Sequence, residues 1–154
     1  MQKLLNAAYF YLRFRPRSEH EMRQYLEKKQ KKYQLEESQV QEAVDELKRQ
    51  SLIDDQSFIS WFVEIRGTSK KKSSRMVRYE LQRYGVSPDD IERYFSSHEF
   101  DELQQAIRAL SGRWRSLQAF DSKKRFERAA AFLQRKGFSY SQIKTAIAEF
   151  EQKR

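Results

Sequence analysis

Fifteen lysine and arginine side chains fall in three clusters along this chain of 154 residues. Guanidinium and ammonium groups bind phosphates and carboxylates through charge-assisted hydrogen bonds. Because each cluster gathers several such groups within a short stretch, the pattern indicates binding of a polyanion rather than catalysis. The clusters are Arg13, Arg15 and Arg17; Arg66, Lys70, Lys71, Lys72, Arg75 and Arg78; and Arg113, Arg115, Lys123, Lys124, Arg125 and Arg128.

The overall charge supports the same interpretation. Lys and Arg number 31 against 22 Asp and Glu, which gives a net charge of +9. Such an excess favours nucleic acid first, and an acidic protein groove or an anionic membrane second. In the alternative interpretation, these side chains only solvate the faces of helices. Their recurrence at three comparable places favours a binding surface.

Neither the acidic residues nor the histidines form a catalytic or metal-binding set. Asp54–Asp55 and Asp89–Asp90 could act as paired carboxylates, but each pair lies at an expected helix start, where capping explains it. His20 and His98 are far apart in sequence and lack the Cys or acid partners of a metal site. There is no Cys, no phosphate-binding glycine loop and no nucleophile motif. We therefore expect no enzyme activity, metal, cofactor or small-molecule substrate.

The elements that must position the basic clusters are expected to be helices. Leu, Glu, Gln, Lys, Arg and Ala dominate, whereas four Gly and two Pro leave little turn chemistry for β-structure. Apolar residues recur three and four positions apart, as in amphipathic helices. We expect an all-α protein whose core includes Phe58, Trp61, Phe62, Leu81, Trp114 and Leu133. Trp61 and Trp114 could instead stack on bases, but both lie on apolar stripes.

Polar residues mark the expected helix boundaries. Three pairs have the spacing of capping boxes, in which each side chain bonds a backbone N–H near the other: Ser18–Glu21, Ser38–Gln41 and Ser139–Gln142. Asp54 is expected to begin a helix that runs to Arg66, because its carboxylate can accept hydrogen bonds from unpaired backbone N–H groups. Gly67 is expected to end that helix.

The helices fall into three units that resemble one another. Setting Leu26, Leu81 and Leu133 in register places Gly85 opposite Gly137, with a repeat of 52 to 55 residues. Units of this size bury little surface alone, so neighbouring units must share apolar faces. We expect three tandem three-helix units, residues 1–51, 52–97 and 98–154, that form an elongated, curved array.

Three groups of residues follow one another in a familiar order. They are Ser18-x-x-Glu21-Met22; Leu52-Ile53-Asp54-Asp55-x-x-Phe58 with Val63 and Arg66; and Lys124, Arg128 and Leu133 with Arg135-Lys136-Gly137-Phe138-Ser139. Together they resemble the RecX family, the bacterial regulators of the RecA recombinase, over roughly residues 5 to 150. RecX-like sequences often have Gly where this chain has Ser51, and a Gly-Pro pair where it has Lys72 and Ser73.

The resemblance implies a non-enzymatic regulatory protein. RecX-like proteins bind the RecA nucleoprotein filament and restrain strand exchange, ATP hydrolysis and coprotease activity. This implies a role in DNA repair, DNA recombination and the SOS response, with the basic clusters as the contact surface for RecA and for single- or double-stranded DNA. The alternative is a stand-alone DNA-binding module that acts without the recombinase.

The setting of the protein is also expected from the sequence. The absence of cysteine fits a reducing, cytoplasmic compartment. No apolar run approaches the ~18 residues of a membrane span, so no membrane contact is expected. We also expect a monomer.

Overall fold

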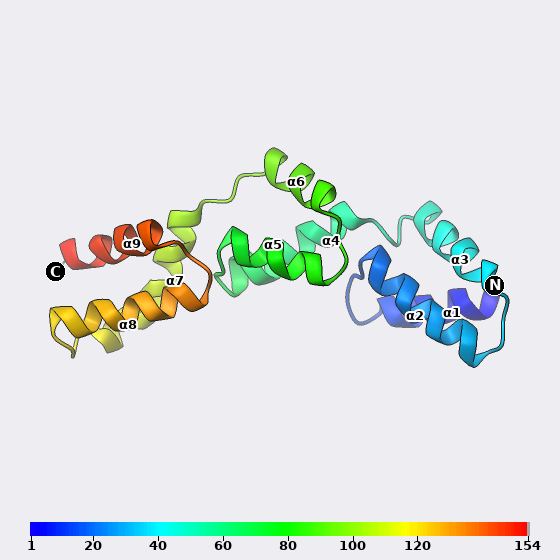
Figure 1. Ribbon diagram of the computed structural model, residues 1–154, viewed down its shortest axis with the longest axis horizontal. Coiled ribbons are helices and arrows are strands. Elements are labelled where there is room, and N and C mark those ends of the chain that lie inside the picture. The colour runs from blue at the N-terminus through cyan, green and yellow to red at the C-terminus, as the bar shows by residue number, and fades with distance from the viewer. Residues whose placement is uncertain (154) are drawn as a thin grey trace. The chain divides into compact units, whose positions relative to one another are not determined.

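The computed structural model describes residues 1–153 and their side chains, except the side chain of Thr68. Within that range every regular element is helical (Figure 1), and no helix is long and apolar enough to cross a membrane. The α-helices are α1 (Gln2–Leu12), α2 (Glu19–Lys32), α3 (Ser38–Arg49), α4 (Asp55–Phe62), α5 (Ser74–Arg83), α6 (Pro88–Ser97), α7 (Glu102–Leu117), α8 (Ser122–Arg135) and α9 (Tyr140–Gln152).

The chain packs as two compact units. The first contains residues 1–61 and 81–96, and the second contains residues 62–80 and 97–154. Residues of the middle helices therefore contribute to both units. The domain boundaries 1–51, 52–97 and 98–154 stay a prediction.

In the first unit, α1, α2 and α3 pack against one another (Figure 1). Each helix turns one apolar stripe inward, as the spacing predicts. Ala8 and Ala43 are fully buried, and such small residues leave room for the larger ones between the helices. The shared core consists of Leu4, Leu5, Ala8, Met22, Leu26, Val40, Ala43, Val44, Leu47 and Ile53.

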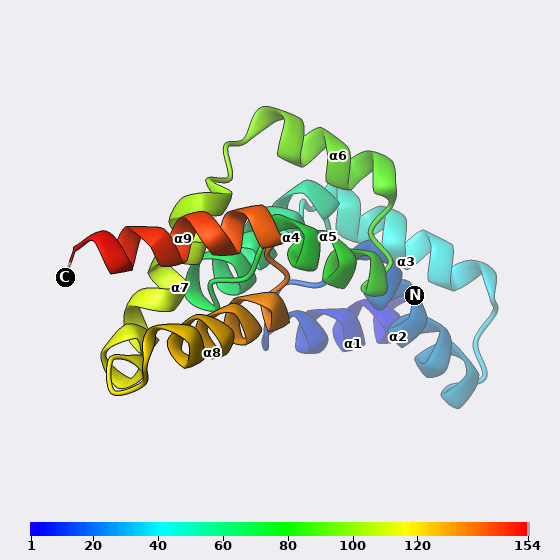
Figure 2. The same ribbon diagram turned by 60° about the vertical axis from the view of Figure 1, so that its left-hand side comes forward.

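In the second unit, α7, α8 and α9 form another three-helix bundle (Figure 2). Its core is Ala106, Ala109, Leu110, Trp114, Leu117, Ala129, Leu133, Phe138, Ile143, Ala146 and Ile147. The Trp114 ring packs 5.2 Å from that of Phe150. Phe58, Phe62, Leu81, Trp114 and Leu133 are all buried, whereas Trp61 is only half-buried, with the guanidinium carbon of Arg15 5.9 Å from the centre of its ring.

The capping boxes at Ser18 and Ser139 form as predicted. The capping box predicted at Ser38 does not form, so this prediction is wrong. Helix α3 is entered through a tight turn, in which the N–H groups of Gln39 and Val40 bond the carbonyls of Glu36 and Glu37. Backbone acceptors thus take the place that the serine hydroxyl would have filled.

Gly67 does not end the helix that Asp54 begins. A π-helix, Val63–Ser69, carries the winding past it, with the N–H of Lys70 bonded to the carbonyl of Ile65. A Cβ on Gly67 would lie 2.8 Å from the ring of Phe100, and Gln105 Nε2 donates to the carbonyl of Gly67. The glycine is therefore needed for close packing rather than for termination.

Two similar joints connect consecutive three-helix repeats, one within each compact unit. In the first, the Ser18 hydroxyl donates to the carbonyl of Tyr84 at 2.7 Å. In the second, the N–H of Ser73 donates to the carbonyl of Lys136 at 3.0 Å. In each joint the serine caps the second helix of one repeat. It contacts the end of the second helix of the next repeat, where Gly85 or Gly137 has a positive φ.

Candidate functional site

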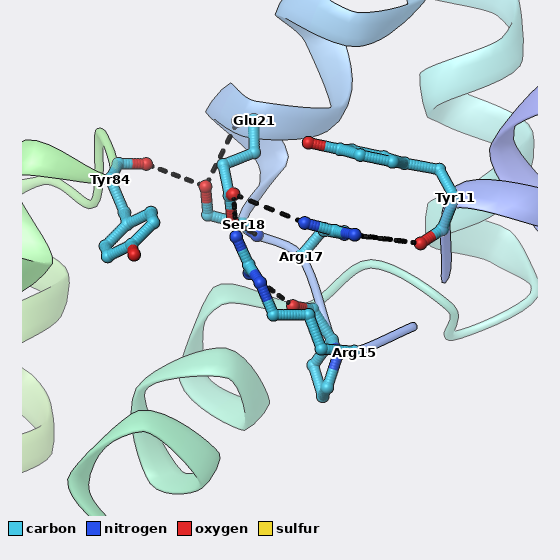
Figure 3. Close-up of polar contacts among 7 residues, drawn as sticks. Tyr11, Arg15, Arg17, Ser18, Glu21 and Tyr84 are labelled. Carbon is cyan, nitrogen blue, oxygen red and sulfur yellow. Dashed lines mark hydrogen bonds and ion pairs between the residues drawn. The ribbon is translucent and has the colours of Figure 1, made fainter. Parts of the chain in front are cut away.

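The first basic cluster lies where α1 joins α2 (Figure 3). Arg15 Nη1 lies 3.1 Å from Glu21 Oε1, and its Nη2 bonds the other carboxylate oxygen. This pairing raises the pKa of Arg15 above its usual value. Its guanidinium carbon also lies 5.3 Å from the centre of the Tyr84 ring. Arg15 therefore helps to fix the first joint.

Arg17 is held just as closely (Figure 3). Its guanidinium carbon lies 3.7 Å from the Tyr11 ring centre, and its Nε and Nη2 donate to the Tyr11 carbonyl at 3.3 and 3.2 Å. Tyr11 in turn stacks on Tyr25 with ring centres 3.9 Å apart. Of this cluster, Arg13 is the exposed member. The prediction of a contact surface here therefore rests on Arg13 alone.

Two cations of the middle cluster are paired with a carboxylate of α5. Lys72 Nζ bonds Glu80 Oε1 at 2.5 Å, and Arg66 Nε lies 3.8 Å from Glu80 Oε2. Lys70 is exposed and Lys71 half-buried in the connection from the π-helix to α5. On α5 itself, Arg75 is exposed and Arg78 is half-buried.

Arg125 of the third cluster is not a surface residue, and its assignment to a contact surface is wrong. Its side chain is only 4% exposed. Its Nε and Nη2 bond the Glu151 carboxylate at 2.7 and 3.1 Å, and Nη1 donates to the Phe120 carbonyl at 2.8 Å. Hydrogen bonding to Glu151 raises the pKa of Arg125. A buried guanidinium needs such partners, and α9 brings the Glu151 carboxylate to Arg125 only in the folded chain.

The other residues of the third cluster do not all lie together. Lys124 and Arg128 lie over the Phe120 ring, 5.2 and 4.4 Å from its centre. Arg115 and Lys123 are exposed on α7 and α8. Arg113 lies apart from them: it packs against the Phe132 ring and lines a pocket. The cluster that looks continuous in sequence is therefore not continuous in space.

One pocket joins cations that are distant in sequence. Lys70, Lys71 and Arg113 line it together with Lys136, which the sequence analysis did not propose. We call this set the four-cation pocket. Lys136 is at the C-terminal end of α8, next to Gly137, so its position in the second joint places it beside the middle repeat. Two sequence signals mark this position: the Arg135-Lys136-Gly137-Phe138-Ser139 stretch that carries the resemblance, and the alignment of Gly137 with Gly85.

Asp54 caps a helix as predicted, whereas at Asp89–Asp90 the hydroxyl of Ser87 accepts the N–H of Asp90 at 3.1 Å. Asp54 Oδ1 accepts the N–H of Gln56 at 2.9 Å, at the start of α4. Asp55 Oδ1 accepts the N–H of Glu19 at 2.9 Å and so links α4 to α2. Burial, followed by repulsion from Glu19, Asp90 and Asp54, raises the pKa of Asp55. Among the described residues, no group of three His, Cys, Asp or Glu could hold a metal ion.

Comparison with models of protein families identifies the family of the chain. RecX domain models match the chain in order: the first three-helix domain over residues 5–47, the second over 54–94 and the third over 101–147. The chain belongs to the RecX family. The all-α fold of tandem three-helix domains, expected from the repeat and from the resemblance, is thereby confirmed.

Individual RecX proteins are similar to the chain throughout its length. The regulatory protein RecX of Geobacillus thermodenitrificans is 29% identical over 150 residues, which cover 97% of this chain and 54% of that protein. The regulatory protein RecX of Oceanobacillus iheyensis is 28% identical over 152 residues, which cover 98% and 54%. The chain thus spans about half the length of these curated relatives.

A solved RecX structure has the same fold. The crystal structure of RecX from Lactobacillus salivarius superposes with a TM-score of 0.79 at 20% identity and covers 98% of this chain and 96% of that one. At this identity the likeness concerns the fold alone. RecX proteins are named as regulatory proteins rather than as enzymes, which agrees with the absence of a catalytic motif from the sequence.

Proposed function

We propose that this RecX-family chain binds the RecA nucleoprotein filament and inhibits its recombinase, ATPase and coprotease activities, and so regulates DNA repair. The observation that carries the proposal is the match of three RecX three-helix domains, in order, across residues 5–147. The proposal places the protein in the cytoplasm, where the filament forms.

The contact surface is proposed to be cationic, because the filament presents DNA phosphates and protein carboxylates. The structure narrows the residues available for it. Arg125 is buried, and Arg15, Arg17, Arg66 and Lys72 are paired with carboxylates. The candidates that remain are Arg13, Lys70, Lys71, Arg75, Arg78, Arg113, Arg115, Lys123, Lys124 and Arg128.

A co-sedimentation experiment tests the proposal. The protein is mixed with preformed cognate RecA filaments on single-stranded DNA, or with the same DNA alone, and RecA ATP hydrolysis is followed in parallel. We expect more protein to sediment with the filament than with DNA, and ATP hydrolysis to slow. Absence of both effects would refute the proposal.

Charge reversal identifies the contact surface. The triple variant Lys70→Glu, Lys71→Glu, Arg113→Glu should lose filament binding, because it puts acids where anions are bound. The control variant Lys28→Glu, Lys31→Glu, Lys153→Glu changes the net charge equally at exposed positions outside the clusters. It should retain most binding. Equal loss in both variants would mean that net charge alone matters.

A stand-alone DNA-binding module is the second candidate. It is favoured by the four-cation pocket, whose described lining residues include no Asp or Glu. This function predicts equal sedimentation with naked DNA and with the filament, and a steep dependence of DNA affinity on salt.

A further inference from the structure

The four-cation pocket is built from three separate elements of the second compact unit. Lys70 and Lys71 come from the connection before α5, Gly112 and Arg113 from α7, and Phe132 and Lys136 from α8. The pocket is an open depression of about 310 Å³. Because the elements are brought together by folding, no local feature of the sequence explains why their cations converge.

Hydrogen bonding and aromatic contacts hold the cations in place. Lys136 Nζ donates to the Lys70 carbonyl at 2.8 Å, which ties α8 to the connection. Arg113 and Lys136 share one aromatic ring, with the guanidinium carbon 4.6 Å and the ammonium nitrogen 5.4 Å from the centre of Phe132. Cations over an aromatic face are attracted to it. Two of the four charges are thus positioned before any ligand arrives.

The electrostatics of the pocket are unfavourable without an anion. Burial, followed by repulsion from Lys72, Lys71, Arg113 and Lys70, lowers the pKa of Lys136. Lys72 is already paired with Glu80, but the described residues that line the pocket include no carboxylate. A bound anion would relieve this repulsion.

The backbone also favours a ligand site. Lys71 has a φ of 57°, a left-handed conformation that is unfavourable for a residue with a side chain. Such strain is often found at binding sites, and here it places a lysine at the pocket. Gly112 also lines the pocket, and a Cβ added there would meet nothing within 4 Å.

We propose that the four-cation pocket binds a phosphate group. An arginine fork and three lysine ammonium groups suit a tetrahedral oxyanion. The phosphate can come from a nucleic-acid backbone or from a free phosphate compound, and both sources share this chemistry. The proposal deepens the proposed function, since a filament contains DNA, but it can be tested without RecA.

Calorimetric titration of the full chain tests the proposal with four probes. They are a twelve-residue oligothymidylate, the same oligomer with uncharged methylphosphonate links, inorganic pyrophosphate and polyglutamate. We expect the phosphodiester oligomer to bind and its methylphosphonate form not to. If pyrophosphate alone binds, the source is a free phosphate compound. Equal binding of both oligomers, or binding of polyglutamate alone, overturns the proposal.

Variants locate the binding. Lys136→Met should weaken phosphodiester binding about tenfold or more, the loss expected for one charge-assisted hydrogen bond. Lys144→Met, at an exposed position of α9 outside the three clusters and the pocket, should stay within about twofold, because it removes one charge that does not line the pocket. Wild-type affinity in Lys136→Met overturns the proposal. Should that variant not fold by circular dichroism, Arg113→Met at an exposed position carries the same test.

The two proposals can fail separately. If the protein binds the oligonucleotide but does not co-sediment with the filament, the proposal of filament binding is refuted and the proposal of phosphate binding in the pocket stands. If the protein binds the filament but not the phosphate probes, the proposal of phosphate binding in the pocket is refuted. The filament would then be bound through the RecA protein surface.

Discussion

The Ser18 hydroxyl donates a 2.7 Å hydrogen bond to the main-chain carbonyl of Tyr84, which lies 66 residues further along the chain. The same oxygen accepts the N–H of Glu21 at 3.1 Å, and the side chain is fully buried. One hydroxyl therefore both caps α2 and fastens the first joint.

Replacing Ser18 by Ala should lower the free energy of unfolding by about 2 kcal/mol, since it removes the cap and leaves a buried carbonyl without its donor. Ser139→Ala is the matched control, because Ser139 forms the same kind of capping box at the start of α9. It should cost about 1 kcal/mol. Urea unfolding of both variants measures the difference. Equal losses would mean that the bond to Tyr84 contributes nothing.

Two glycines should respond oppositely to alanine. Gly137 has a φ of 96°, and a Cβ there would lie 2.9 Å from Met76 Cβ and would also strike the Ser73 hydroxyl. Gly137→Ala should therefore cost about 2 kcal/mol or more. Gly112→Ala, in the exposed interior of α7, should instead gain about 0.5–1 kcal/mol from lower unfolded-state entropy. Thermal unfolding gives both signs, and a tolerated Gly137→Ala would contradict the tight second joint.

Ser51 stands where RecX-like sequences often have glycine, and its φ is 58°. Its neighbours complete a helix-ending motif, with the N–H of Leu52 bonded to the carbonyl of Leu47, a geometry that favours glycine. Ser51→Gly should therefore stabilise the chain by on the order of 1 kcal/mol. Ser60→Gly, at an exposed site within α4, should destabilise it by about 0.5–1 kcal/mol. A melting temperature that falls in Ser51→Gly would contradict this account.

The pH dependence of stability should report on Asp55. Its raised pKa means that the folded chain holds this proton more tightly than the unfolded chain does. Ionisation therefore destabilises the fold; the effect is absent below the ordinary Asp pKa of about 3.9 and complete above the raised pKa.

Asp55→Asn removes the buried charge while an amide oxygen can still accept the N–H of Glu19. Its melting temperature should exceed that of the wild type at pH 7, and the gain should disappear as the pH falls to 3. Asp54→Asn, at the exposed cap, should change the unfolding free energy by less than about 0.5 kcal/mol. A gain from Asp55→Asn that is the same at pH 3 and pH 7 would rule out ionisation as its cause.

Much of the fold could be predicted because its signals are local. The spacing of apolar residues predicted the helices, and the pairs Ser18–Glu21 and Ser139–Gln142 predicted where two of the helices begin. Ser38 shows the limit of that rule, since a backbone turn can supply the same hydrogen bonds. The register of Gly85 with Gly137 pointed to equivalent helix ends, and both glycines have a positive φ.

The candidate site was harder to predict, because its partners come from distant parts of the chain. Arg125 belongs to a basic run in sequence, yet Glu151 on α9 holds it in the interior. Lys136 belongs to a helix end, yet it lies beside Lys70. Charge clustering along a sequence identifies the residues that a polyanion could meet, but tertiary packing decides which of them face outward.

The π-helical winding of Val63–Ser69 also bears on how related sequences should be aligned. A turn closed by i→i+5 bonds holds more residues than an α turn. A relative with one residue fewer between Phe62 and Lys70 can therefore wind the same segment as an ordinary α-helix. Length variation at this point would change how far the following lysines reach and would shorten the 66-residue separation of Ser18 and Tyr84, while Ser73 and Lys136 keep their spacing.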